Sequence, residues 1–271
     1  MNRIKDLYKY LPDDKINWDL IIKEILSPFA QDLANTFQEP KWHGEGDVLT
    51  HTKMVCEYLI SLNEYKELNS FDKLLVFLAC LFHDIGKITC TKEIDGEITS
   101  KNHALKGSIR LREYLWKDLG LCGTKEYQQF REALCLLVRY HSIPIWEFDD
   151  KTIKKIIKIS INQELTCYFN IRLLAIVSKA DALGRISSFD DEHLEHISMF
   201  IQVAKELDCY DKPFKFSNSY TKQQYFEKEN VWHYQSLYDS TWKEAILVCG
   251  LPGTCLLYTS DAADDRISAD L

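Results

Sequence analysis

The stretch LFHDIGK, residues 81–87, determines how the rest of the chain is interpreted. It ends an apolar run, residues 74–82, that predicts a buried helix. His83 and Asp84 would be costly at the end of such a run, because a buried carboxylate needs a partner that cancels its charge. A divalent cation is such a partner.

Two further residues of this stretch fit a binding site. Gly86 would let the backbone leave the helix, and Lys87 would follow within reach of an anion bound beside the cation. Taken alone, the stretch leaves an alternative open, in which a core histidine with satisfied hydrogen bonds precedes an exposed aspartate. The remaining polar residues decide between the two.

Composition limits the possible classes of protein. The 271 residues suffice for one large or two small domains, and 46% hydrophobic with 27% charged residues is typical of soluble globular proteins. Nine cysteines without a C-x-x-C pair favour buried thiols in a reducing compartment. We find neither a signal peptide nor an apolar run near the ~20 residues that cross a bilayer, so we expect a cytoplasmic protein without a membrane partner. At a net charge of −8, any nucleic-acid contact would have to be local.

The first 210 residues predict an all-α domain. After a helical lead-in over residues 1–40, periodic apolar residues predict helices over residues 48–62, 70–82, 102–119, 126–140, 152–161, 170–183 and 190–207. Asp47 and Asn69 are the predicted N-caps of the first two. Residues 90–100 predict a loop or short hairpin with its turn at Asp95-Gly96.

A set of polar residues lies within or at the ends of otherwise apolar helices: His51, His83, Asp84, His103, His141 and Asp181. Imidazole and carboxylate without thiolate suit divalent Mn, Fe, Co, Ni or Zn in an open hydrolytic site. We therefore expect one or two divalent transition-metal ions as cofactors. One ion would take His51, His83, Asp84 and Asp181, and a second would take His103 and His141, with Asp84 bridging the pair.

Five pieces of the chain carry a family resemblance: HGEGDVLTHT (43–52), LFHDIGK (81–87), NHALKGS (102–108), RYHSIP (139–144) and SKADALGR (178–185). Their order and spacing, from Trp42 to Ser188, resemble the HD-domain metal-dependent phosphohydrolases. The last two look particularly like the HD domain of some bacterial tRNA nucleotidyltransferases. The resemblance implies an HD-domain helical bundle and metal-ligand roles for the six residues above.

The resemblance also implies catalytic roles for Asp84, Lys87 and Arg185, the last two as groups that grip a substrate phosphate. Independently, Arg185 lies four residues after Asp181, so both could face one pocket, and a guanidinium suits phosphate oxygens. His43, in the loop before the first ligand, is a further candidate for substrate binding.

We expect no ligand role for the other histidines. His193 and His196 are three residues apart on one helix face, but that helix begins with an acidic stretch and predicts a solvated surface. Nothing in the sequence supports a role for His233.

The C-terminal part predicts a different fold. Residues 211–241 predict a linker or docking segment, and residues 242–254 the start of a truncated P-loop α/β domain. A buried strand over 245–249 leads into Gly250, Gly253 and Thr254, but Cys255 and Leu256 replace the glycine and lysine that a nucleotide site needs. Residues 255–271 are expected to be a non-native tail, since CLLYTS resembles a translated transposase sequencing adapter; a natural acidic tail is the alternative.

This order of segments resembles bifunctional end-healing enzymes that join an HD domain to a polynucleotide kinase in RNA repair. It implies a phosphoesterase for phosphomonoesters or 2′,3′-cyclic phosphodiesters, with a nucleotide or an RNA or DNA end as substrate. One alternative is a nucleotidase or cyclic-nucleotide phosphodiesterase unrelated to repair. Another is a non-catalytic module that binds nucleotide or RNA, although such a module need not keep six costly buried ligands.

Overall fold

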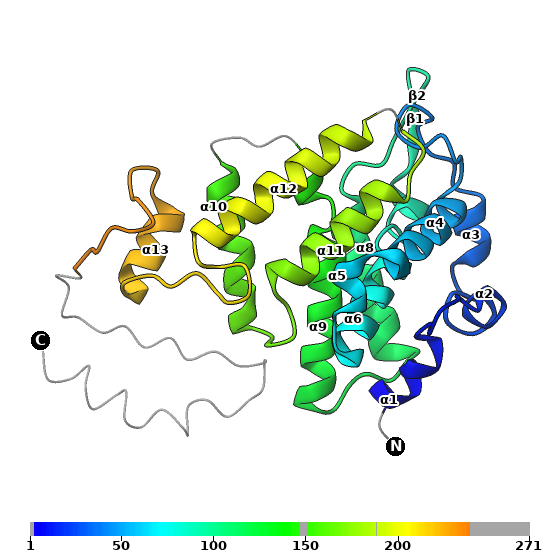
Figure 1. The fold of residues 1–271 in the computed structure, drawn as a ribbon, viewed down its shortest axis with the longest axis horizontal. Coiled ribbons are helices and arrows are strands. Elements are labelled where there is room, and N and C mark those ends of the chain that lie inside the picture. The colour runs from blue at the N-terminus through cyan, green and yellow to red at the C-terminus, as the bar shows by residue number, and fades with distance from the viewer. Residues whose placement is uncertain (1–2, 147–150, 188, 239–271) are drawn as a thin grey trace, which may run out of the picture. The chain divides into compact units, whose positions relative to one another are not determined.

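The computed structural model describes residues 3–146, 151–187 and 189–238, and the chain divides into two units, Met1–Lys215 and Phe216–Leu271. Figure 1 shows the order of the elements along the chain. The longer helices of the first unit are α4 (Val48–Ser61), α6 (Ser70–Phe82), α8 (His103–Lys117), α9 (Lys125–Tyr140), α10 (Thr152–Ser160), α11 (Ile171–Leu183) and α12 (Asp190–Glu206). Shorter helices are α1 (Arg3–Leu7), α2 (Trp18–Leu20), α3 (Ala30–Ala34), α5 (Asn63–Lys66) and α7 (Lys87–Cys90), and the 3₁₀ or π turns are η1 (Tyr8–Tyr10), η2 (Ile21–Ile25), η3 (Ile143–Ile145) and η4 (Ile161–Glu164).

Helix α6 is the core of this unit. Every residue from Leu74 to Phe82 is buried, and the helix packs against α4, α9 and α11. Asn69 begins it by accepting a hydrogen bond from the Asp72 backbone N–H at 2.9 Å, as the sequence predicts. A helix that is apolar on all sides has to be enclosed, so the residues at its C-terminal end lie deep inside the bundle.

Two glycines allow helices to approach closely at this depth. A Cβ on Gly86 would lie 2.0 Å from the His103 carbonyl oxygen, and one on Gly184 would lie 2.5 Å from Val55 Cα. The φ of Gly86 is −71°, an ordinary helical value, so our prediction that it frees the backbone to leave the helix is wrong. Gly86 is needed because α8 begins directly against it.

A hairpin of strands β1 (Lys92–Ile94) and β2 (Glu97–Thr99) interrupts the helices. Asp95 and Gly96 both have positive φ, 55° and 83°, which is the backbone of a tight two-residue hairpin turn. The predicted turn is confirmed. In the described part of the chain this antiparallel pair is the only sheet.

The second unit contains α13 (Ser219–Glu227), a helix that our sequence interpretation of 211–241 as a linker or docking segment did not include. Asn218 begins it, accepting a hydrogen bond from the Thr221 N–H at 2.7 Å. The predicted strand 245–249 and the incomplete P-loop residues Gly250, Gly253 and Thr254 lie outside the described residues. Among the residues that are described, none of the helices has the length and apolar character needed to cross a bilayer.

Candidate active site

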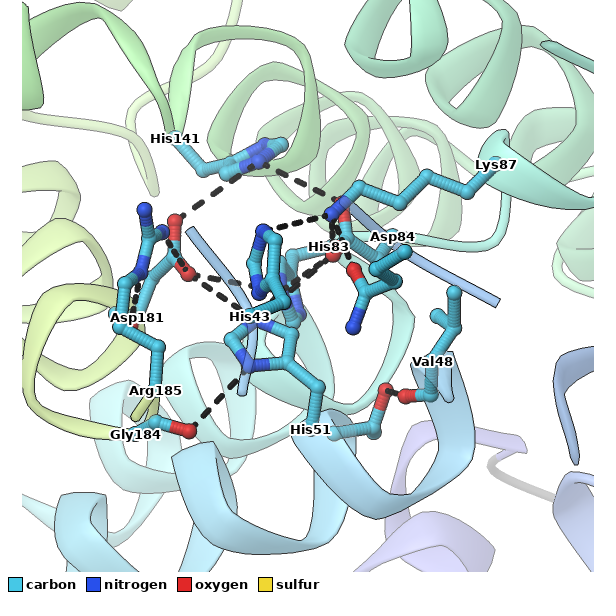
Figure 2. A network of polar contacts seen from close by, with 12 residues as sticks. His43, Val48, His51, His83, Asp84, Lys87, His141, Asp181, Gly184 and Arg185 are labelled. Carbon is cyan, nitrogen blue, oxygen red and sulfur yellow. Dashed lines mark hydrogen bonds and ion pairs between the residues drawn. The ribbon is translucent and has the colours of Figure 1, made fainter. Parts of the chain in front are cut away.

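The structure brings the six predicted ligand residues together around one point. Figure 2 labels all of them except His103. They come from five helices or the residues that follow them directly: His51 from α4, His83 and Asp84 after α6, His103 from the start of α8, His141 after α9, and Asp181 from α11. All are buried except His103, whose side chain is 21% exposed. Residues 130 positions apart, such as His51 and Asp181, are in direct contact.

One half of the cluster is formed by His51, His83, Asp84 and Asp181. His51 Nε2 lies 3.2 Å from His83 Nε2 and 3.1 Å from Asp181 Oδ1. Asp84 Oδ2 lies 3.2 Å from His83 Nε2 and 3.7 Å from His51 Nε2. These are the separations of atoms that could share one cation at the ~2.0–2.2 Å bond lengths of imidazole and carboxylate ligands.

The other half is formed by His103 and His141 with the second oxygen of Asp84. His103 Nε2 lies 3.4 Å from His141 Nε2 and 3.3 Å from Asp84 Oδ1. His141 Nε2 is also 4.0 Å from Asp181 Oδ2. Asp84 therefore directs one oxygen to each half, as a bridging ligand does.

The backbone fixes which nitrogen of three imidazoles faces the cluster. Nδ1 of His83, His103 and His141 lies 2.7, 2.9 and 2.8 Å from the carbonyl oxygen three residues earlier. A carbonyl only accepts, so each Nδ1 carries a proton, and Nε2 is the nitrogen that faces the cluster and can offer a lone pair when the ring is neutral.

The cluster fits divalent cations. Imidazole Nε2 atoms and carboxylate oxygens face one another at 3.1–3.4 Å, which is repulsive unless protons or cations lie between them. Asp84 Oδ1 is buried and has no hydrogen-bond donor within the described part of the chain. A set of imidazoles and carboxylates without thiolate suits Mn, Fe, Co, Ni or Zn.

Burial and charge set the protonation of the cluster. Burial alone would raise the pKa of Asp84, but the charges of His83 and Lys87 hold that pKa well below its usual range. Burial likewise opposes ionisation of Asp181, and Arg185 beside it keeps the pKa of that carboxyl low. Burial lowers the pKa of His141 to about 3, so this imidazole stays neutral and able to donate its lone pair.

Both predicted phosphate-gripping residues contact the cluster carboxylates. Lys87 Nζ lies 2.7 Å from Asp84 Oδ2 and donates to Gln38 Oε1 at 2.5 Å. Arg185 Nη2 donates to Asp181 Oδ1 at 2.5 Å. The two cations therefore lie on opposite sides of the cluster, each next to one carboxylate (Figure 2).

His43 is buried beside Lys87, with its Nε2 3.4 Å from Lys87 Nζ and its Nδ1 2.9 Å from Glu45 Oε1. Our sequence analysis missed Glu45. Its Oε1 also lies 2.8 Å from His51 Nδ1, and its Oε2 accepts a hydrogen bond from the Ile186 N–H at 2.9 Å. The signal available in the sequence was an acidic residue in the HGEG loop that precedes the helix of His51.

The prediction that His193 is solvated is wrong, because its side chain is 5% exposed and its ring lies beside Trp42, with centroids 6.2 Å apart. Its Nδ1 is buried without a hydrogen-bond partner in the described part of the chain. His196 Nδ1 donates to the Ile145 carbonyl at 3.0 Å. The structure places neither residue in the cluster, and His233 packs against Trp232 and Tyr234 in the second unit.

The cluster forms the floor of a cavity of about 510 Å³, a size that suits a small ligand. Asp84, His103, His141 and Asp181 line its floor, and Lys87 and Arg185 lie beside them. The walls include Trp42, His43, Lys101, Arg139, Trp146 and His193.

Comparison with known proteins agrees with this geometry. Residues 48–186 match the family model described as HD domain, and this range holds all six cluster residues together with Lys87 and Arg185. The Multifunctional CCA protein of Psychromonas ingrahamii (strain DSM 17664 / CCUG 51855 / 37) is 31% identical over 119 residues, which are 44% of this chain and 25% of that protein. The chain thus aligns with about a quarter of the length of this relative.

Proposed function

The chain belongs to the HD domain family of metal-dependent phosphohydrolases, and from this we propose that it hydrolyses phosphomonoesters or 2′,3′-cyclic phosphodiesters of nucleotides or nucleic-acid ends. The observation that carries the proposal is the placement of Asp84 between the two halves of the buried cluster, at the floor of a cavity that also presents Lys87 and Arg185. Such a floor suits a phosphate group, which needs several positive charges in one place.

The chain's own residues would position and stabilise the phosphate. His51, His83, Asp84 and Asp181 would hold one cation, and Asp84, His103 and His141 a second. Bound divalent cations supply Lewis acidity toward phosphoryl oxygens and lower the pKa of water. In the reaction, oxygen from water adds to phosphorus as the bond from phosphorus to a ribose oxygen breaks, and that oxygen leaves with a proton.

Lys87 and Arg185 would act on the charge that develops during this step. In the structure each neutralises a cluster carboxylate. With cations held by the carboxylates, the ammonium and the guanidinium would be available to the non-bridging oxygens of the substrate. His43, next to Lys87 and lining the cavity, would orient the ammonium or contact the substrate directly.

Substitution of Asp84 tests this proposal. Asp84→Ala removes a ligand from both halves, so we expect metal content to fall and hydrolysis of a 2′,3′-cyclic nucleotide with added Mn²⁺, Co²⁺ or Ni²⁺ to be lost. Lys87→Ala and Arg185→Ala should retain metal and lower kcat/KM by about 10²–10³-fold, the effect of losing one positioned electrostatic donor. Asp118→Ala, at an exposed aspartate outside the cavity, is the matched control. Full activity in Asp84→Ala would contradict the proposal.

Two alternatives use the same cavity. A nucleotidase or a cyclic-nucleotide phosphodiesterase would need the same cluster, and a panel of 3′-, 5′- and cyclic nucleotides separates these from end healing. A non-catalytic module that binds nucleotide or RNA would bind the panel without turnover. The buried cluster of ligand atoms supports a catalytic function over a purely binding one. Burying these polar groups destabilises the protein, and a module that only binds nucleotide or RNA does not need them.

We further propose that the chain belongs to an end-healing fusion whose kinase half begins at residues 242–254 and is interrupted after Thr254. The support is the sequence GLPGT following an apolar stretch, and its departure from the P-loop pattern at Cys255 and Leu256. Resequencing the gene beyond codon 254 tests this. A glycine and a lysine codon at positions 255 and 256, followed by a further domain, are expected; a genuine CLLYTSDAAD followed by a stop would refute it.

A further inference from the structure

Arg139 is an arginine of the cavity lining with no carboxylate partner in the described part of the chain. Arg112, Arg131, Arg172 and Arg185 each form an ion pair. Arg139 is half-buried, lines the cavity above the cluster, and has its guanidinium carbon 5.9 Å from the Tyr140 ring. An unpaired guanidinium that is partly removed from water gains by binding an anion.

This guanidinium is additional to the groups that serve the reacting phosphate. Lys87 and Arg185 lie next to the cluster carboxylates, whereas Arg139 contacts none of them. The cavity lining also contains Lys101, and its acidic residue outside the cluster, Glu39, accepts a hydrogen bond from the Ile98 N–H at 2.8 Å. On a chain with a net charge of −8, the cavity wall outside the cluster thus has excess positive charge.

Trp146 adds an aromatic surface to the lining of the same cavity. It is 62% exposed and lines the cavity, seven residues after Arg139 along the chain. An exposed indole is costly to solvate, and in sites for single-stranded nucleic acid such rings stack on bases beside cations that hold the phosphates. A guanidinium and an indole in the lining of one cavity match the phosphate and the base of one nucleotide.

We propose that Arg139 and Trp146 form a subsite for the nucleotide adjoining the scissile phosphate, so that the preferred substrate is the end of a nucleic-acid strand rather than a free mononucleotide. This rests on the proposed phosphoesterase function. The cluster, Lys87 and Arg185 hold the terminal phosphate. Arg139 holds the next phosphodiester along the strand, and Trp146 stacks on a base.

The test compares adenosine 3′-monophosphate with the dinucleotide ApAp, which carries the same terminal phosphate and one additional phosphodiester. We expect the wild-type kcat/KM to be roughly 10-fold or more higher for the dinucleotide. Arg139→Gln should lower kcat/KM for the dinucleotide by roughly 10–100-fold, the effect of one charge-assisted hydrogen bond. The fold-loss in kcat/KM for the mononucleotide should be smaller than this by a factor of roughly 10 or more. Trp146→Ala should lower the dinucleotide value roughly 10-fold, with Trp146→Phe partly restoring it.

Two matched controls lie outside the cavity. Arg110→Gln removes an arginine that is also half-buried against a ring, Phe29, and Trp232→Ala removes a tryptophan with the same 62% exposure. Neither control should change the ratio of kcat/KM for the dinucleotide to kcat/KM for the mononucleotide. Equal losses for both substrates in Arg139→Gln, or no dinucleotide preference in the wild type, would overturn the subsite.

A binding measurement separates this proposal from the proposed function. Fluorescence anisotropy of a labelled tetranucleotide on the metal-free protein should give a Kd that Arg139→Gln and Trp146→Ala each weaken by roughly 10-fold. RNA and DNA tetranucleotides are measured separately. Both should show the same weakening in the variants, because the subsite contacts only groups that the two share. If the wild type hydrolyses neither substrate, the proposed function fails while these Kd values still test the subsite; unchanged Kd values overturn it.

Discussion

At the scale of single residues, the cluster depends on what lies behind each imidazole. His83, His103 and His141 are oriented by local carbonyls, whereas His51 Nδ1 lies 3.2 Å from the Gly184 carbonyl and 2.8 Å from Glu45 Oε1. Among the residues that the structure describes, Glu45 is the one carboxylate outside the cluster that contacts a ligand imidazole. Such carboxylate–histidine pairs orient the ring and make its free nitrogen a stronger ligand.

Glu45→Gln should accordingly weaken cation binding without unfolding the protein. We expect the affinity for Mn²⁺ to fall by about 10–100-fold, the usual effect of losing such a pair. Isothermal titration calorimetry on the chelator-treated protein measures it. Glu64→Gln, which breaks only the exposed pair with Lys179, should leave the affinity unchanged. An unchanged affinity in Glu45→Gln would show that the Gly184 carbonyl alone orients His51.

The pKa of His141 links stability to pH in the metal-free protein. Burial lowers that pKa to about 3, against ~6.5 in an unfolded chain. Between these values the unfolded state binds a proton that the folded state does not, so the free energy of unfolding should fall as the pH drops from 6.5 toward 3. The low pKa values of Asp84 and Asp181 act in the same direction at lower pH, and the raised pKa of His83 acts in the opposite direction.

Urea unfolding of the chelated protein at pH 7 and pH 5 measures this linkage. His141→Asn removes one proton-linked group, so the loss of stability between the two pH values should shrink by up to about 2 kcal/mol. His196→Asn, at a histidine outside the cluster, is the comparison. An unchanged loss in His141→Asn would mean that the folded protein protonates this imidazole as readily as the unfolded chain does.

At the scale of elements, the sequence allowed good prediction wherever local chemistry decides. Asp47 and Asn69 accept hydrogen bonds from the N–H groups three residues on, and Asp95-Gly96 makes the predicted turn, because caps and tight turns depend on a few neighbouring residues. His193 was misjudged because Asp191, Glu192 and Glu195 are exposed while its own ring lies beside Trp42. Which side of a helix is covered is decided by distant residues.

The close approach of α11 and α4 at Gly184 gives a prediction at this scale. Gly184→Ala would place a methyl group 2.5 Å from Val55 Cα and push α11 away from α4. We expect a loss of about 1–3 kcal/mol in stability, as overpacking usually costs, together with weaker Mn²⁺ binding because His51 and Asp181 separate. Gly123→Asn, at a glycine with φ +82° and no atom within 4 Å of an added Cβ, should affect neither property strongly. Wild-type metal affinity in Gly184→Ala would contradict the coupling.

At the scale of the molecule, the identity of the cluster residues was predictable and their supporting contacts were not. A polar residue in an apolar helix is visible in the sequence, because burying it needs a compensating partner. The contact of Lys87 with Gln38 joins residues 49 positions apart, so nothing in the local pattern indicates it. Glu45 is close to His51 in the sequence, but whether its carboxylate reaches Nδ1 depends on the conformation of the loop between them. The cluster residues could therefore be found in the sequence, but the contacts that orient them could be found only in the structure.

The position of the cluster within the first unit leads to a last prediction, about how much of the chain the site needs. All six cluster residues lie within Met1–Lys215, and that unit is completed by its final residues. Arg172 Nε donates to Asp211 Oδ1 at 2.8 Å, the Phe214 N–H donates to Ser160 Oγ at 3.0 Å, and Phe214 itself is 4% exposed. A protein that ends at Lys215 keeps these contacts, so it should fold cooperatively and bind Mn²⁺ as the full chain does.

A protein that ends at Leu207 provides the sharpest comparison. It loses the Asp211 and Phe214 contacts, and removal of a buried phenylalanine side chain usually costs about 3–5 kcal/mol. We expect its urea midpoint to fall well below that of the Lys215 form, with Mn²⁺ partly restoring it, because cations bind only the folded state. Calorimetric titration and urea unfolding of both shortened proteins and the full chain measure this. Equal midpoints for the two shortened proteins would show that the unit is already complete at the end of α12.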